Sequence, residues 1–153
     1  MADVTNTLVE ELLLAPYWVI DVLPYRVPAN SGGQYFAVEE YLLEQPQIDD
    51  IRKKMAEVIL KLNCYTDLQV SRGPRDDWAT NPKPDQLAGW IRECVPSNEM
   101  AADHISFVIQ SEYALITLNR DDTYLTVYGA SPEFRELLAA LATSAGLFMW
   151  KAS

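Results

Sequence analysis

Apolar residues recur every three to four positions between residues 47 and 62, which is the pattern of a helix with one buried face. Asp49 and Asp50 stand in the first turn of this stretch, and Lys61 stands in the last. Acids near the start and a base near the end are the charges that a helix dipole favours. We therefore predict a helix over Gln47–Leu62.

Three further stretches carry weaker helical signals. Ser131–Ala145 begins with a residue suited to the N-cap and is followed by Gly146, which can take the left-handed conformation that ends a helix. Pro84–Val95 has a proline at its start and an apolar face. Leu8–Leu14 is a candidate for a short N-terminal helix.

Strands are predicted where aromatic and β-branched residues cluster between turn-forming residues. The predicted strands are Tyr17–Leu23, Gln34–Leu43, Tyr65–Ser71, Ile105–Ile109, Tyr113–Leu118, Thr123–Tyr128 and Leu147–Lys151. The segment Asn119–Asp122 has the residues of a hairpin turn.

Closely spaced strands require antiparallel pairing, whereas a helix between two strands allows a parallel pair. The pattern therefore predicts an α+β fold: a mixed, mainly antiparallel sheet of about six or seven strands with three helices, in the order ββαβ-α-βββαβ. We expect one globular domain over residues 1–153, with residues 1–15 as a peripheral segment.

Charge and composition restrict the classes of partner. The 153 residues include 12 basic and 22 acidic side chains, a net charge of −10, which disfavours binding to nucleic acid. The longest uncharged apolar run, Leu12–Ile20, has nine residues and is too short to cross a bilayer. With two cysteines and no secretion-signal pattern at the start, the sequence predicts a cytoplasmic protein that binds neither nucleic acid nor membrane.

Motifs that would indicate catalysis are missing from the sequence. It contains no glycine-rich nucleotide loop, no nucleophile elbow and no metal-binding spacing of cysteine and histidine. His104 is the only imidazole, so it would serve any scheme in which histidine pairs with Cys64 or Cys94. A surface histidine with two structural cysteines is the commoner arrangement. We predict no cofactor, no metal and no catalytic residue.

Asp21 is the most informative polar residue, because it is a lone acid inside an apolar run. A buried carboxylate is costly unless it is paired, and burial raises its pKa. Two interpretations remain: a pocket acid partnered by Arg26, or an acid at a strand edge or in a structural ion pair. Tyr35 belongs to a group of tyrosines near the first two predicted strands, which fits either a ligand groove or the covering of a small core.

Trp78 lies in the longest predicted loop, Ser71–Asp85. A tryptophan in a polar loop either anchors the loop on the core or serves as an exposed recognition residue. Anchoring is the commoner role, and the loop remains a candidate contact surface.

Four segments together carry a resemblance to known proteins. They are Pro16–Pro24, Gly33–Glu39, Leu60–Tyr65 and Asp122–Tyr128. In these segments the chain resembles a family of small bacterial proteins with no assigned function, and the similarity extends over most of the chain from about Leu12. The resemblance implies no activity, ligand or catalytic residue.

Two functional hypotheses follow. The first is a non-catalytic acidic interaction or binding module, with a basic protein partner or with self-association through an edge strand. The second is a small enzyme or ligand-binding protein with a tyrosine-lined pocket around Asp21 and Arg26. The second hypothesis requires these two side chains to converge on one concave site.

Overall fold

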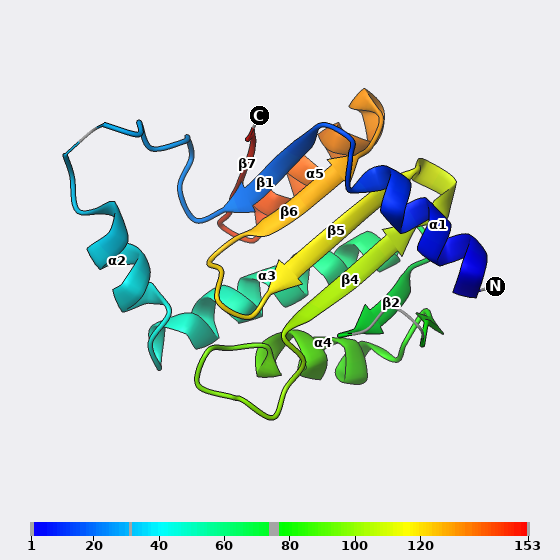
Figure 1. The fold of residues 1–153 in the computed structure, drawn as a ribbon, viewed down its shortest axis with the longest axis horizontal. Helices are drawn as coiled ribbons and strands as arrows, with labels where there is room; N and C mark the ends of the chain where they lie inside the picture. The colour runs from blue at the N-terminus through cyan, green and yellow to red at the C-terminus, as the bar shows by residue number, and fades with distance from the viewer. Residues whose placement is uncertain (1, 31, 74–76, 153) are drawn as a thin grey trace.

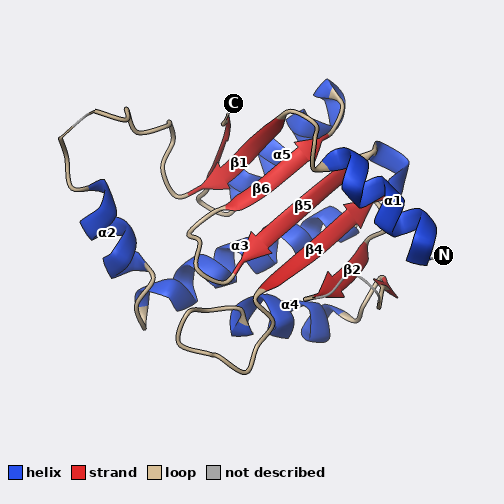
Figure 2. Cartoon of the chain, viewed as in Figure 1, coloured by secondary structure: helices blue, strands red, loops and turns tan. Residues whose placement is uncertain are grey.

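The computed structural model describes residues 2–30, 32–73 and 77–152, and in this part of the chain it has an α+β fold (Figures 1 and 2). The strands are β1 (Tyr17–Asp21), β2 (Gln69–Arg72), β3 (Ala79–Thr80), β4 (His104–Ile109), β5 (Ala114–Asn119), β6 (Leu125–Gly129) and β7 (Phe148–Lys151). The helices are α1 (Ala2–Leu12), α2 (Tyr35–Leu42), α3 (Gln47–Asn63), α4 (Pro84–Glu93) and α5 (Pro132–Ser144), with a short 3-10 turn, η1 (Gln110–Glu112).

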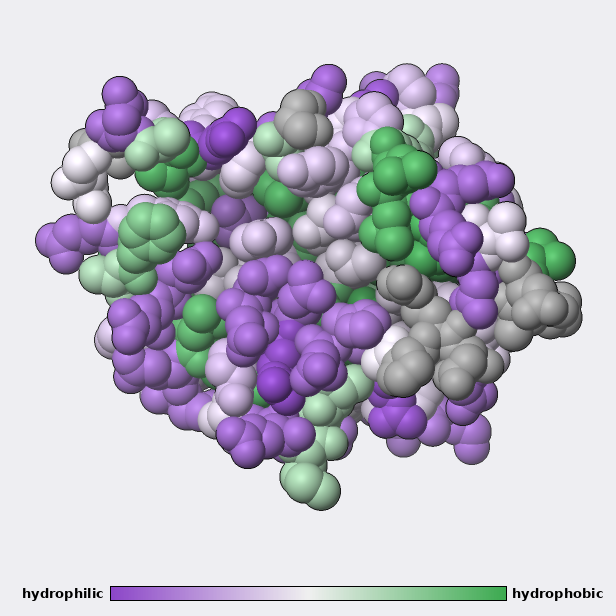
Figure 3. All heavy atoms as spheres, viewed as in Figure 1, coloured by the Kyte–Doolittle hydropathy of each residue, from purple (hydrophilic) through white to green (hydrophobic). Residues whose placement is uncertain are grey.

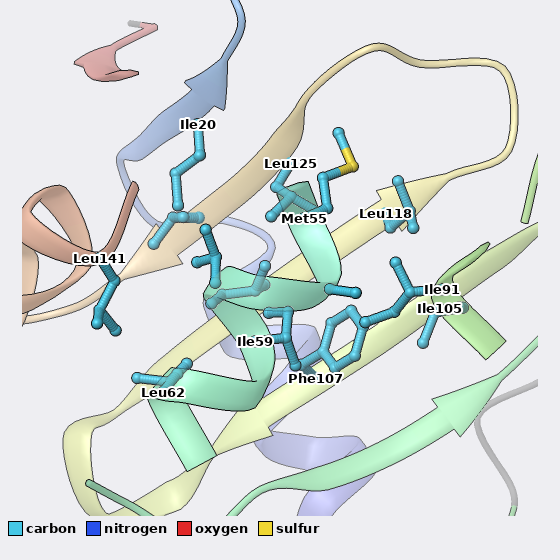
Figure 4. Packing of buried hydrophobic residues seen from close by; sticks show 14 of the residues in the cluster. Ile20, Met55, Ile59, Leu62, Ile91, Ile105, Phe107, Leu118, Leu125 and Leu141 are labelled. Carbon is cyan, nitrogen blue, oxygen red and sulfur yellow. The ribbon is translucent and has the colours of Figure 1, made fainter. Parts of the chain in front are cut away.

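The strands form one sheet in the order β3-β2-β4-β5-β6-β1-β7, and each neighbouring pair is antiparallel. Helices α3, α4 and α5 lie together behind the sheet in Figure 1. Their apolar residues meet the inward-facing strand residues in one buried cluster, and Figure 4 shows side chains of both kinds meeting there. This cluster contains most of the buried apolar residues and is therefore the main core. Burying one such aliphatic side chain contributes about 1.5–3 kcal/mol.

The other face of the sheet is covered only in part. Val9 and Leu12 of α1 pack against Val108 of β4 and Leu115 of β5 in a second, smaller cluster. Helix α1 lies across the front of the sheet, near one end of β4 and β5 (Figure 1). The front of β6, β1 and β7 lies beyond this helix and carries the candidate site.

The main prediction that fails is the strand over Gln34–Leu43, which is the helix α2. Aromatic and β-branched residues favour strands only where a sheet offers neighbours to pack on. Here no residue of the helix is buried, and the segment stands to one side of the sheet (Figure 1). The Tyr35 hydroxyl donates a hydrogen bond to Glu39 Oε2 at 3.0 Å. These residues are one helical turn apart, so the bond supports the helix.

The sheet is entirely antiparallel among the described residues, so the predicted mixed sheet is also wrong. Strand β1 lies between β6 and β7, which separates the two strands that flank α5 and prevents a parallel pair. The described chain has five α-helices rather than three, and α1 begins earlier than the predicted Leu8–Leu14. The element order therefore differs from ββαβ-α-βββαβ, with the short strand β3 as a further addition.

Other local predictions are confirmed. Helices α3, α4 and α5 occur within a few residues of the predicted bounds. The Ser131 hydroxyl accepts a hydrogen bond from the N–H of Phe134 at 3.2 Å, as an N-cap does, and Gly146 has φ +83°. Asn119–Asp122 joins β5 to β6 as an antiparallel hairpin. In the described ranges, no helix has both the length and the apolar character needed to cross a membrane.

Candidate functional site

A cavity of about 830 Å³ lies on the front of β1, β6 and β7, where α1 leaves the sheet uncovered. The segment that follows β1 and the start of α2 enclose it from the side, and the space-filling view shows the surface hollowed between that segment and the sheet (Figure 3). Its principal side chains are Tyr17, Val19, Asp21, Arg26, Tyr35, Phe36, Asn119, Asp122, Tyr124, Thr126, Tyr128 and Trp150.

The strand register explains why these residues share one face. Successive strand side chains point to opposite faces, and residues directly opposite one another in a pair point to the same face. In β1, Val19 lies opposite both Thr126 of β6 and Trp150 of β7. Tyr17 lies opposite Tyr128, and their ring centroids are 5.6 Å apart. The alternation thus places one face of each strand in the core and the other in the cavity.

Asp21 ends β1 and is only 5% exposed, although it lines the cavity. The N–H of Val22 donates to its Oδ1 at 2.7 Å, which fixes the orientation of the carboxyl group. Burial raises the pKa of Asp21, hydrogen bonds from the backbone of Val22 and Leu23 oppose this rise, and the charge of Glu39 adds to it. The group is therefore a desolvated acid on the cavity wall.

Asp122 brings a second carboxylate to the same cavity, from the turn between β5 and β6. It accepts a hydrogen bond from Asn119 Nδ2 at 3.1 Å. Burial is the largest cause that raises the pKa of Asp122, and the charge of Glu39 raises it further. Glu39 in α2 thus acts on both cavity acids, Asp21 and Asp122.

Two cavity tyrosines, Tyr124 and Tyr35, stay protonated far above neutral pH. Burial, followed by the charges of Asp122, Glu39 and Asp21, raises the pKa of Tyr124 to about 12. Burial and the hydrogen bond to Glu39 raise the pKa of Tyr35 further still. The cavity therefore combines neutral phenol groups with negative charge.

Three of the five residues singled out from the sequence, Asp21, Arg26 and Tyr35, line this one cavity. Asp21 and Arg26 thus line the same cavity, and the pocket function attached to them stays a prediction. Arg26 is exposed, and its Nη1 donates to the carbonyl of Ala152 at 3.4 Å. The guanidinium thus lies on the rim beside the end of β7.

Trp78 and His104 lie outside the cavity. Trp78 packs against the α1 cluster and its Nε1 donates to Asn6 Oδ1 at 2.9 Å, so it anchors its loop, of which residues 74–76 lie outside the described residues. His104 begins β4 opposite Asn119, one strand beyond the cavity wall. The thiols of Cys64 and Cys94 donate to the carbonyls of Leu60 and Ala102 rather than to an imidazole.

Sequence reasoning did not single out Asp122, Tyr124 and Trp150. The alternation of side chains along the predicted strand Thr123–Tyr128 is a signal that could have placed Tyr124, Thr126 and Tyr128 on one face. It did not indicate that this face is uncovered, because that depends on the position of α1. Asp122 was predicted only as a turn residue, and Trp150 only as part of a final strand.

Comparisons with protein-family models, with curated proteins and with solved structures each find no match. The resemblance to small bacterial proteins stays an expectation from the sequence. Within the described residues, no three histidine, cysteine, aspartate or glutamate side chains gather closely enough to hold a metal ion.

Proposed function

We propose that this protein binds a small organic molecule in the cavity on the front of β1, β6 and β7. The observation that carries the proposal is the cavity itself, because about 830 Å³ falls within the roughly 300–1,000 Å³ typical of small-molecule sites. Aromatic surface with a few polar groups at fixed positions is the usual composition of such sites.

Two features of the cavity wall also suit a binding site: one segment is held by a hydrogen bond, and one aromatic ring is left exposed. The indole N–H of Trp150 donates to the carbonyl of Leu23 at 3.0 Å, which ties the segment after β1 to the sheet edge. Phe36 at the start of α2 is 80% exposed, although a phenylalanine gains free energy by leaving water. A ligand that contacts this ring would cover apolar surface that the chain alone leaves in water.

The proposal can be tested with three aromatic probes of different charge: benzylamine, benzyl alcohol and benzoate. Each would be titrated into ¹⁵N-labelled protein while amide and indole shifts are followed. We expect at least one probe to shift the Trp150 indole and the amides of β1 and β6 in a saturable way.

A matched pair of variants controls this experiment. Thr126→Trp places a large side chain in the cavity and should abolish the saturable shifts. Met100→Trp adds the same side chain at a position that is 96% exposed and does not line the cavity, so it should leave them intact. If no probe binds the wild type, or if Thr126→Trp binds as well as Met100→Trp, the proposal is wrong.

A second candidate function is the binding of a basic protein partner, and α2 is the observation that favours it. This helix has no buried residue and exposes Phe36, Val38 and Tyr41 beside the acids Glu39 and Glu40. Apolar side chains with surrounding acids suit a partner with a basic rim. A pull-down from the native cell at low salt that recovers no partner would count against this candidate.

Self-association through β7 is compatible with either function, because β7 is an edge strand of four residues with Phe148 partly exposed. Light scattering over a range of concentrations tests it. A molar mass that stays at that of one chain would exclude it.

A further inference from the structure

The charge of the cavity wall suggests which class of molecule the site takes. Asp21 and Asp122 both line the cavity, and Glu39 is close enough to raise the pKa of each. Among the described residues of the cavity wall, Arg26 alone carries a positive charge. Its guanidinium is exposed on the rim and hydrogen-bonded to a backbone carbonyl, so it does not neutralise Asp21.

Neither cavity acid takes part in the salt bridges found between described residues. Those two bridges join Lys54 to Asp50 and Arg120 to Asp103. Burying a carboxylate without a positive partner costs free energy, because the protein interior solvates charge less well than water. At Asp21 the hydrogen bonds come from the backbone of Val22 and Leu23, which are uncharged donors. At Asp122 the charge of Arg52 already favours the carboxylate, so the countercharge that a cation in the cavity would supply is the one missing at Asp21.

Aromatic rings supply the second half of a cation site. Tyr35 and Tyr124 lie close enough to Asp21 for its charge to raise the pKa of each hydroxyl. The rest of the cavity wall carries further rings, those of Phe36, Tyr17, Tyr128 and Trp150. The face of an aromatic ring attracts a positive charge, and this attraction grows when water is excluded. Rings around a desolvated carboxylate therefore favour an ammonium group that carries apolar substituents.

The alternative of an anionic ligand is less favourable at the same site. An anion would have to approach two cavity acids, and Arg26 offers it only an exposed charge that solvent screens. The overall charge of −10 adds to the repulsion of anions and to the attraction of cations.

From this arrangement we infer that the ligand is a small organic cation, an amine with an apolar or aromatic body, whose ammonium group lies against the Asp21 carboxylate. The inference rests on the proposed function, since it names the ligand class of the same cavity. The aromatic body would contact the tyrosines and Phe36, and Asp122 would face the ligand from the turn between β5 and β6.

The test compares benzylamine, benzyl alcohol and benzoate by isothermal titration calorimetry at neutral pH. These probes have similar size and differ in charge. We expect benzylamine to bind about 10-fold or more tightly than benzyl alcohol, because hydrogen bonds to charged groups are the stronger ones. Benzoate should bind more weakly than both.

Variants then locate the charge that is responsible. Asp21→Asn keeps the shape of the side chain and an oxygen that can accept from Val22 N–H, so it should weaken benzylamine about 10-fold or more and leave benzyl alcohol unchanged. Glu99→Gln makes the same change in net charge at an exposed position outside the cavity and should leave both affinities unchanged. Circular dichroism would verify that both variants are folded.

The outcomes separate this inference from the proposed function. If benzyl alcohol or benzoate binds in the cavity as tightly as benzylamine, the inference fails while the small-molecule site stands. Equal benzylamine affinity in Asp21→Asn and Glu99→Gln also overturns the inference. If no probe binds, the inference and the proposed function fail together.

Discussion

Replacing Arg52 with methionine should destabilise the fold by about 2–4 kcal/mol, and the reason lies in the contacts of a fully buried guanidinium. Arg52 extends from α3 and is 0% exposed. Its Nε donates to the carbonyl of Cys94 at 2.6 Å, and its Nη2 donates to the carbonyls of Arg120 at 3.0 Å and Asn119 at 3.5 Å. One side chain thus joins the end of α4 to the turn between β5 and β6.

The magnitude follows from the two shorter bonds. Leaving a buried carbonyl without its donor costs about 1–3 kcal/mol, so losing both donors costs about 2–6 kcal/mol. Methionine also removes a desolvated charge, and burial has lowered the pKa of Arg52 to about 10, so part of the loss is regained. At neutral pH the wild-type guanidinium remains charged, and we therefore expect a net loss in the lower part of the range.

Urea denaturation followed by circular dichroism measures this loss. Arg52→Lys is the matched control, because lysine keeps the charge but lacks the fork that spans two carbonyls, and its loss should be smaller than that of Arg52→Met. Equal stability of Arg52→Met and the wild type, within about 0.5 kcal/mol, would refute the reasoning.

Four further predictions each concern a single position. Gly129→Ala should cost about 2–5 kcal/mol, because φ is +74° and the new methyl group would meet a leucine carbon of α1 at 2.6 Å and a backbone oxygen at 2.7 Å. Gly32→Ala, with φ +69° and open space, should cost only about 1–2 kcal/mol in the same denaturation assay. Ser131→Ala should lose about 1 kcal/mol through the missing N-cap, and an unchanged midpoint would exclude that role. Asp21→Asn should stabilise the ligand-free protein at neutral pH. The raised native pKa means that the folded state holds its proton more firmly, so wild-type stability falls as pH rises from the ordinary value of 3.8 through the native pKa. The gain should therefore disappear below about pH 3.8, and a gain that persists there in thermal melts would contradict it.

The sequence predicted the fold correctly where residues close together in the chain determine the local structure. The apolar stripe of α3, the Ser131 cap and the hairpin turn all depend on neighbouring residues, and each occurs as predicted. The segment of α2 has a composition typical of strands, but it has no sheet neighbour and forms a helix instead. The mainly antiparallel sheet of six or seven strands is confirmed, but the parallel pairs are wrong, because the insertion of β1 between β6 and β7 is a long-range arrangement that the spacing of strands does not encode.

The candidate site was also predictable only in part. A lone acid in an apolar run identified Asp21, and nearby charged and aromatic residues led to Arg26 and Tyr35, all of which line the cavity. Trp78 and His104 stand elsewhere, since a position in a loop or at a strand start does not reveal which surface lies beside it. The cavity exists because α1 covers only one end of the front face, and no local pattern in the sequence expresses that.

The most direct test of the account is a crystal structure of the protein soaked with benzylamine. The account predicts the ammonium nitrogen within hydrogen-bond distance of the Asp21 carboxylate, with the aromatic ring beside Tyr35 and Tyr124. An unoccupied cavity at saturating benzylamine, or electron density for the amine only at surface positions outside it, would contradict the account.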